Sequence, residues 1–132
     1  MLSHLSVKNY ALIEELEIDF LTGFSVVTGE TGSGKSIMLG ALGLILGERA
    51  DLKVLRDTNI KCVIEGTFEL SRSLFLQFFV ENDIDFEKQS ILRREISPSG
   101  KSRAFVNDTP VLLPVLKELG TSLIDIHSQH QT

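Results

Sequence analysis

Eight residues, GETGSGKS at positions 29–36, have the types and spacing needed to hold a chain of phosphates. Glycines let the backbone curl tightly, so that successive N–H groups point at phosphate oxygens. Lys35 adds a mobile positive charge for the β- and γ-phosphates, and the Ser36 hydroxyl can ligate Mg²⁺. The stretch therefore predicts a nucleotide site that takes ATP and Mg²⁺.

All eight positions are predicted to bind the cofactor: Gly29, Glu30, Thr31, Gly32, Ser33, Gly34, Lys35 and Ser36. A glycine turn that matches the motif by chance is the alternative. The motif requires a strand before it and a helix after it. FSVV at 24–27 is strand-like and IMLGALGLIL at 37–46 is helix-like, so the neighbours of the motif favour nucleotide binding.

Two strands are predicted before the loop. Leu5 and Val7 indicate the first, while Leu16, Ile18 and Phe20 alternate with acidic residues in the second. A period of two is typical of a half-buried strand. The two strands are expected to run antiparallel across a turn at residues 9–13.

The helix after the loop is expected over residues 35–46 and is apolar nearly all round, which predicts burial. Three glycines fall on one of its faces at a cost in helix propensity. We interpret Gly40 and Gly43 as allowing close packing and Gly47 as ending the helix.

The middle of the chain predicts a strand, a helix and a hairpin. CVIEGTFEL at 62–70 alternates again, with Cys62 on the apolar side, and phenylalanines and leucines at 71–83 indicate a short helix. Residues 91–107 are predicted to form two strands joined by the Pro- and Gly-containing turn SPSGKS.

Towards the end of the chain, Pro114 fits the first turn of a helix that we expect to run to Leu119. Gly120 is interpreted as the cap of that helix. SLIDI at 122–126 is then expected to form a last apolar strand.

Length and composition indicate one globular domain of 132 residues with a net charge of −5. No apolar run approaches the ~20 residues of a membrane span, and MLSHLSVKNY lacks the layout of a signal peptide. Cys62 has no cysteine partner and is expected to be a small core residue in a reducing compartment. These features predict a cytoplasmic protein that does not associate with membranes.

Two strands before the phosphate loop are typical of ATPase heads of the ABC and SMC type. NYALIEELEIDF, TGETGSGKS followed by GERAD, KSRAFVNDTPV and DIHSQHQ together resemble the N-terminal head segment of the RecN family of SMC-like bacterial DNA repair ATPases. The resemblance covers nearly the whole chain. The expected fold class is therefore an α/β P-loop NTPase, the N-terminal lobe of an ABC/SMC-type ATPase head, with an antiparallel β layer beside the P-loop strand and helix.

The resemblance also implies a function in DNA double-strand break repair and recombination. Residues 1–132 would form the N-terminal lobe, which ends about where a coiled coil begins. The C-terminal lobe of the same protein and a second head in a homodimer would complete the ATPase, so the lobe alone is expected to be inactive. The resemblance further implies DNA binding by the full-length protein and a location at the bacterial nucleoid.

Within that resemblance, Lys35 and Gln129 are the predicted catalytic residues. Gln129 would be the Q-loop glutamine that meets Mg²⁺ together with Ser36 and orients the attacking water. Gln131 is a weaker second choice, and a merely polar chain end is the alternative. His127 and His130 lack the third ligand that a zinc site needs.

Four cations on the expected hairpin are candidates for DNA phosphates: Arg93, Arg94, Lys101 and Arg103. A solvated face, or pairing of these cations with local acids, is the alternative. Lys8 and Asn9 are weaker candidates for a border of the adenine site.

Two other classes of function stay open at this point. A self-contained P-loop kinase or hydrolase would use Asp125 as the acidic residue after its last strand. A non-catalytic interaction module would keep the phosphate loop for structure alone.

Overall fold

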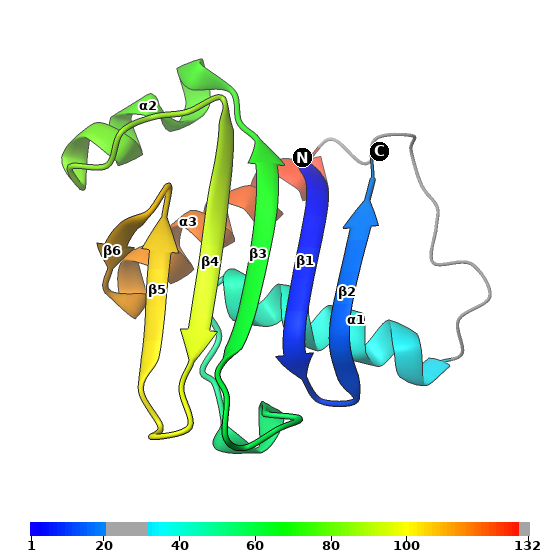
Figure 1. Cartoon of the computed structure of the whole chain (residues 1–132). Helices are drawn as coiled ribbons and strands as arrows, with labels where there is room; N and C mark the ends of the chain where they lie inside the picture. The colour runs from blue at the N-terminus through cyan, green and yellow to red at the C-terminus, as the bar shows by residue number, and fades with distance from the viewer. Residues whose placement is uncertain (21–31, 130–132) are drawn as a thin grey trace.

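The computed structural model describes residues 1–20 and 32–129, without the side chains of 32–35, 52 and 126–129. Six strands of the described residues form one sheet in the order β2-β1-β3-β4-β5-β6, and every neighbouring pair is antiparallel (Figure 1). The strands are β1 Leu2–Tyr10, β2 Ile13–Asp19, β3 Cys62–Glu69, β4 Gln89–Ile96, β5 Ser102–Val106 and β6 Thr109–Val111. The predicted antiparallel β layer is therefore confirmed.

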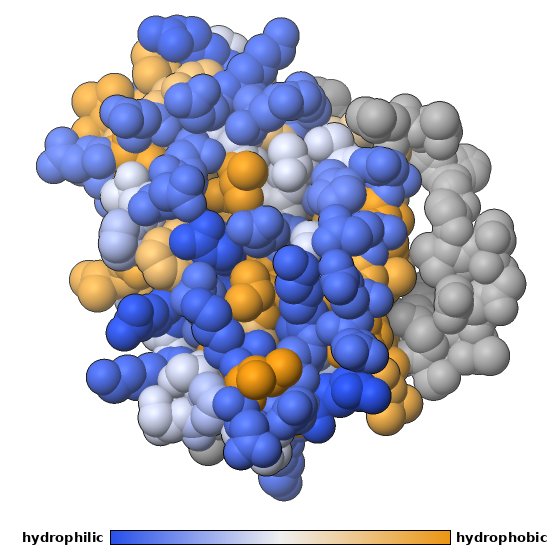
Figure 2. Space-filling view, in the orientation of Figure 1, coloured by the Kyte–Doolittle hydropathy of each residue, from blue (hydrophilic) through white to orange (hydrophobic). Residues whose placement is uncertain are grey.

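Alternation along the strands separates a core face from an open face of the sheet. In β3 every second residue from Cys62 onward is buried, and Ile64 pairs with Val7 of β1 on that same face. The opposite face carries mainly polar and charged residues, and Figure 2 shows it as largely hydrophilic. Residues two apart on a strand share a face, so the period of two read from the sequence decides which side is buried.

Within residues 1–20 and 32–129, three α-helices accompany the sheet: α1 Gly32–Ile45, α2 Arg72–Glu81 and α3 Leu113–Gln129. Helices α1 and α3 lie behind the sheet in Figure 1, whereas α2 packs at one end of it. A short 3-10 helix, η1 Leu52–Val54, lies between α1 and β3. None of the helices in the described part of the chain is both long and apolar enough to cross a membrane.

Gly40 and Gly47 behave as predicted, whereas a Cβ on Gly43 would meet the side chain of Glu48, so no close approach of another element requires that glycine. A Cβ on Gly40 would clash with the hydroxyl of Tyr10, so this glycine allows β1 and α1 to approach closely. Gly47 has a φ of +102°, the left-handed conformation that ends many helices. The nearly all-apolar helix is only partly covered, because Leu39 keeps 60% of its surface exposed while Ala41 and Ile45 are fully buried.

The predicted ending of α3 is wrong. The helix begins as expected near Pro114 but continues through Gly120 to Gln129, so residues 122–126 are helical and form no strand. Gly120 does not cap the helix; a Cβ there would clash with the carbonyl of Leu46 at the end of α1. Leu116, Leu119 and Leu123 face the core at spacings of three and four, and this helical period outweighs the short apolar run.

The middle of the chain agrees with prediction and adds one strand. β3, α2 and the β4–β5 hairpin are all present, whereas β6 was not predicted. Asn107 and Asp108 both have positive φ, which turns the chain tightly from β5 into β6. Cys62 is fully buried as expected, and burial raises the pKa of its thiol to about 12.

Candidate nucleotide-binding site

The first turn of α1 is the part of the predicted phosphate site that the structure describes. The helix begins at Gly32, and by the general rule for helices its first four N–H groups have no partner within the helix. No acidic residue stands in this turn, so nothing in it repels an anion. Free amides and the positive end of the helix dipole fit a phosphate chain.

The eight predicted cofactor residues fall on both sides of the described boundary. Residues 29–31, and the strand expected at 24–27, lie outside the described residues. Residues 32–35 form the first turn of α1, which includes Lys35, and their side chains are not described. Ser36 follows them on the helix and is exposed. The predicted helix after the loop is confirmed, and the loop's contact with nucleotide stays a prediction.

Arg94 lies at the opposite end of α1 and is fully buried. Its Nη1 donates to the carbonyl oxygens of Leu44 at 2.8 Å and Glu48 at 2.7 Å, and its Nη2 donates to Ser102 Oγ at 2.6 Å. A guanidinium in this position cannot meet DNA, so the structure corrects the prediction for Arg94. The signal was present in the sequence, because Leu92, Arg94 and Ile96 share one face of a strand with period two.

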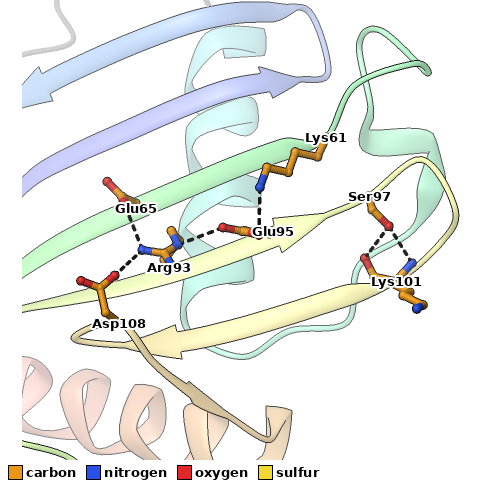
Figure 3. Close-up of polar contacts among 7 residues, drawn as sticks. All are labelled: Lys61, Glu65, Arg93, Glu95, Ser97, Lys101 and Asp108. Atoms are coloured by element: carbon orange, nitrogen blue, oxygen red, sulfur yellow. Dashed lines mark hydrogen bonds and ion pairs between the residues drawn. The ribbon is translucent and has the colours of Figure 1, made fainter.

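Arg93 faces the other side of β4 and is surrounded by acids (Figure 3). Its guanidinium lies 2.8 Å from Asp108, 3.1 Å from Glu95 and 3.5 Å from Glu65. It also stacks 4.2 Å above the ring of Phe105. The alternative of pairing with local acids therefore describes Arg93, whose charge is compensated within the sheet.

Lys101 and Arg103 are the two members of the predicted cationic cluster that are exposed. The backbone N–H of Lys101 donates to Ser97 Oγ, and its carbonyl oxygen accepts a bond from the Ser97 hydroxyl, in the hairpin turn. The structure does not bring all four cations together on one surface, because Arg94 is buried on the opposite face of the sheet.

Asn9 does not border an open site. It is 4% exposed, its Nδ2 donates to the carbonyl oxygens of Asp57 and Ile60, both at 3.0 Å, and its Oδ1 accepts from the Asp57 amide at 2.7 Å. The side chain thereby holds the loop between η1 and β3 against β1. The prediction that Asn9 borders adenine is corrected, while Lys8 beside it is exposed.

The polar residues at the end of the chain lie on α3 or beyond it. Asp125 is exposed on the helix, so it does not follow a buried strand as an acidic ATPase residue would. Gln129 is the last residue of α3, and its predicted position after a strand is wrong. The side chains of His127 and Gln129, together with His130 and Gln131, lie outside the described part of the structure.

Comparison with known proteins identifies both sequence and structural relatives. The family described as AAA domain matches residues 4–110. The DNA repair protein RecN of Bacillus subtilis is 45% identical over 98% of this chain and 23% of its own length. RecN of Vibrio cholerae is 43% identical over 98% of this chain and 24% of its own length. This chain thus spans about a quarter of the length of these relatives.

A solved structure from work on ATP-driven dimerization and DNA-stimulated activation of SMC ATPases superposes with a TM-score of 0.70. The match covers 93% of this chain and 79% of the other at 19% identity, so it establishes the shared fold. The expected fold class, the N-terminal lobe of an ABC/SMC-type ATPase head, is confirmed.

Proposed function

The chain belongs to the AAA domain family and resembles RecN over nearly its whole length, and from this premise we propose that it is the ATP-binding lobe of an SMC-like ATPase in DNA double-strand break repair and recombination. The observation that carries the proposal is the start of α1 at Gly32, inside the sequence GETGSGKS. The motif and the helix start coincide as a phosphate site requires.

In this proposal the backbone of the motif and two of its side chains have different tasks. Amides of residues 29–36 hold the phosphate oxygens, Lys35 neutralises charge on the β- and γ-phosphates, and the Ser36 hydroxyl ligates Mg²⁺. Bound Mg²⁺ offsets the negative charge that develops during phosphoryl transfer. Gln129 stays the proposed Q-loop residue on the resemblance alone.

We place the remainder of the ATPase outside this lobe. Phosphoryl transfer needs a metal held from more than one side and a group that orients water. Residues 1–132 form the N-terminal lobe in this proposal. The missing groups come from a C-terminal lobe of the same protein and from a second head in a homodimer. In this proposal the full-length protein binds DNA, with Lys101 and Arg103 as candidate contacts. The protein is located in the bacterial cytoplasm at the nucleoid.

The location of Asp125 disfavours the alternative of a self-contained kinase or hydrolase. Asp125 was its only candidate for the acidic residue, and this side chain is exposed on a helix. A non-catalytic module would bind nucleotide without any turnover, even when joined to the rest of the protein.

Replacement of Lys35 by alanine tests nucleotide binding. We expect Mg-ATP to raise the melting temperature of the wild-type chain, since a ligand at 100 times its Kd adds about 2.7 kcal/mol of stability. The Lys35→Ala chain should show no such rise, because the charge for the phosphates is gone. Lys88→Ala, at an exposed position away from α1, is the matched control.

Unchanged ATP affinity in the Lys35→Ala chain would refute the assignment of the motif. Steady phosphate release by the wild-type 132-residue chain would refute the placement of catalytic groups outside the lobe. Phosphate release that appears only in the full-length protein supports the ATPase over the non-catalytic module.

A further inference from the structure

Helix α1 has no basic residue of its own in its last turn. The last carbonyl groups of any helix lack partners within it, and a cation near them is favourable because of the helix dipole. Arg94 supplies that cation from β4, in the middle of the sheet. It donates to Leu44 inside the helix and to Glu48 just beyond the turn at Gly47, so one side chain holds the helix end and the chain that leaves it.

The position of Arg94 is itself fixed by its neighbours. It pairs in register with Ile64 of β3 on one side and Ala104 of β5 on the other. Its Nη2 donates to Ser102 of β5, while its Nε has no hydrogen-bond partner in the described structure. The backbone of Arg94 is therefore held between β3 and β5, and its guanidinium is bonded to β5 and to one helix end.

Stability alone is a poor reason for a buried arginine. Replacement of buried charges by apolar residues of similar volume is often neutral or stabilising, because burial of a charge is costly. What an arginine adds is geometry: a planar fork with donors in fixed directions. Here the fork prescribes where the C-terminal end of α1 lies relative to the sheet.

We propose that Arg94 is a positioning residue for nucleotide binding, which holds the C-terminal end of α1 and thereby sets where the amides of its first turn lie. This inference rests on the proposed function. The helix has 14 residues and is about 21 Å long at 1.5 Å per residue. Backbone hydrogen bonds link successive turns of the helix, so in this proposal a shift or rotation at Arg94 is transmitted to the phosphate end.

The other described contacts of α1 are packing contacts, including that of α3 against the carbonyl just beyond the last turn of α1. Gly40 packs on the Tyr10 hydroxyl and Ile45 packs over Gly66 of β3, and both are contacts between surfaces without directional bonds. Among the described residues, Arg94 makes the side-chain hydrogen bonds to the backbone of α1 and its C-terminal turn. Hydrogen bonds depend on direction, so they restrict the rotation of a helix about its axis and its shift along that axis more closely than apolar contacts do.

The test compares Arg94→Met with a destabilised control that does not touch α1. Phe79→Leu creates a space under α2, where Phe79 packs against Phe78 and Phe86 with ring centroids 5.7 and 5.2 Å away. Mg-ATP affinity is measured by calorimetry at a temperature where circular dichroism shows both chains fully folded. We expect a loss on the order of tenfold in Arg94→Met and a change within about twofold in Phe79→Leu, since small displacements of binding groups are costly.

Wild-type affinity in folded Arg94→Met, or an equal loss in Phe79→Leu, would overturn the inference. If Arg94→Met does not fold, Arg94→Lys is measured in its place. Lysine keeps the charge but cannot hold both carbonyl groups and Ser102 with the same fork, so it should again bind Mg-ATP more weakly.

Amide hydrogen exchange separates this inference from the proposed function, because it needs no nucleotide. In Arg94→Met we expect faster exchange at residues 36–40, whose amides are the first that can bond within α1, as well as at 44–48, and in Phe79→Leu at neither. Failure of the wild-type chain to bind ATP refutes the proposed function alone. Unchanged exchange at residues 36–40 in Arg94→Met refutes the role of Arg94.

Discussion

Substitution of Gly120 by alanine gives a sharp test of how α3 packs on α1. In an ordinary helix interior alanine is more favourable than glycine by about 0.8–1.0 kcal/mol. At Gly120, however, the new Cβ would clash with the carbonyl of Leu46. Overpacking typically costs about 1–3 kcal/mol, and a backbone carbonyl cannot step aside as a flexible side chain can. An overpacking cost of about 3 kcal/mol, less a gain in helix propensity of about 1 kcal/mol, gives a net destabilisation of about 2 kcal/mol for Gly120→Ala.

Gly43→Ala is the matched control, the same substitution in the last turn of α1. The nearest atom to a Cβ at Gly43 is Glu48 Cγ at 3.2 Å, which belongs to an exposed, flexible side chain that can move. Gly43→Ala should therefore be neutral, or stabilising by up to about 1 kcal/mol. The two substitutions are chemically identical and differ in what the methyl group meets.

Urea unfolding followed by circular dichroism measures both effects. The midpoint should fall in Gly120→Ala with an unchanged slope, because the substitution alters stability and not the surface exposed on unfolding. At about 4 °C per kcal/mol for a chain of this size, the melting temperature should fall by about 8 °C. A Gly120→Ala chain as stable as wild type or as Gly43→Ala would refute the close contact of α3 with Leu46.

The remaining predictions concern charge on the open face and at the hairpin. Hydrogen bonds that His4 donates to Asp19 and Glu17 raise the pKa of His4 above its ordinary 6.5. The stability lost in His4→Gln should therefore be greatest at pH below that value and vanish as pH rises through the raised pKa. Urea unfolding across pH measures it; equal losses at all pH would contradict it. Charge reversal of Lys101 and Arg103 in the full-length protein should lower DNA affinity and reduce the log–log salt slope by about two. An unchanged slope, as in a Lys88→Glu control, would exclude these contacts.

Much of the sheet could be predicted because its strands bury one face and expose the other. In β2, β3 and the β4–β5 hairpin, apolar and polar residues alternate, and that period survives in the tertiary structure. Strand β6, which follows β4 and β5 in the sheet, has three residues and starts after a turn at Asn107 and Asp108. So short a run carries no period, and its strand character comes from pairing with β5.

The errors at the site arose where the same residue type has two uses. Glycine both ends helices and allows them to touch, and at Gly120 local sequence favours the first use whereas Leu46 requires the second. Arginine both binds phosphates on surfaces and holds carbonyl groups in cores. The sequence therefore predicted that the four arginines and lysines of the hairpin form one cluster. Arg93 and Arg94 are neighbours on a strand, however, so their side chains must lie on opposite faces of the sheet.

By itself the sequence determined the phosphate motif, the helix that follows it, the alternation of the strands and the likeness to RecN, because each is written in residues close together along the chain. Tertiary structure alone decided that α3 runs through Gly120, that Arg94 holds the far end of α1, and that acids surround Arg93. Each of these depends on residues tens of positions apart, such as Arg94 and Leu44, that meet when the sheet and helices pack. Local patterns specify what an element is, and packing specifies what its side chains are for.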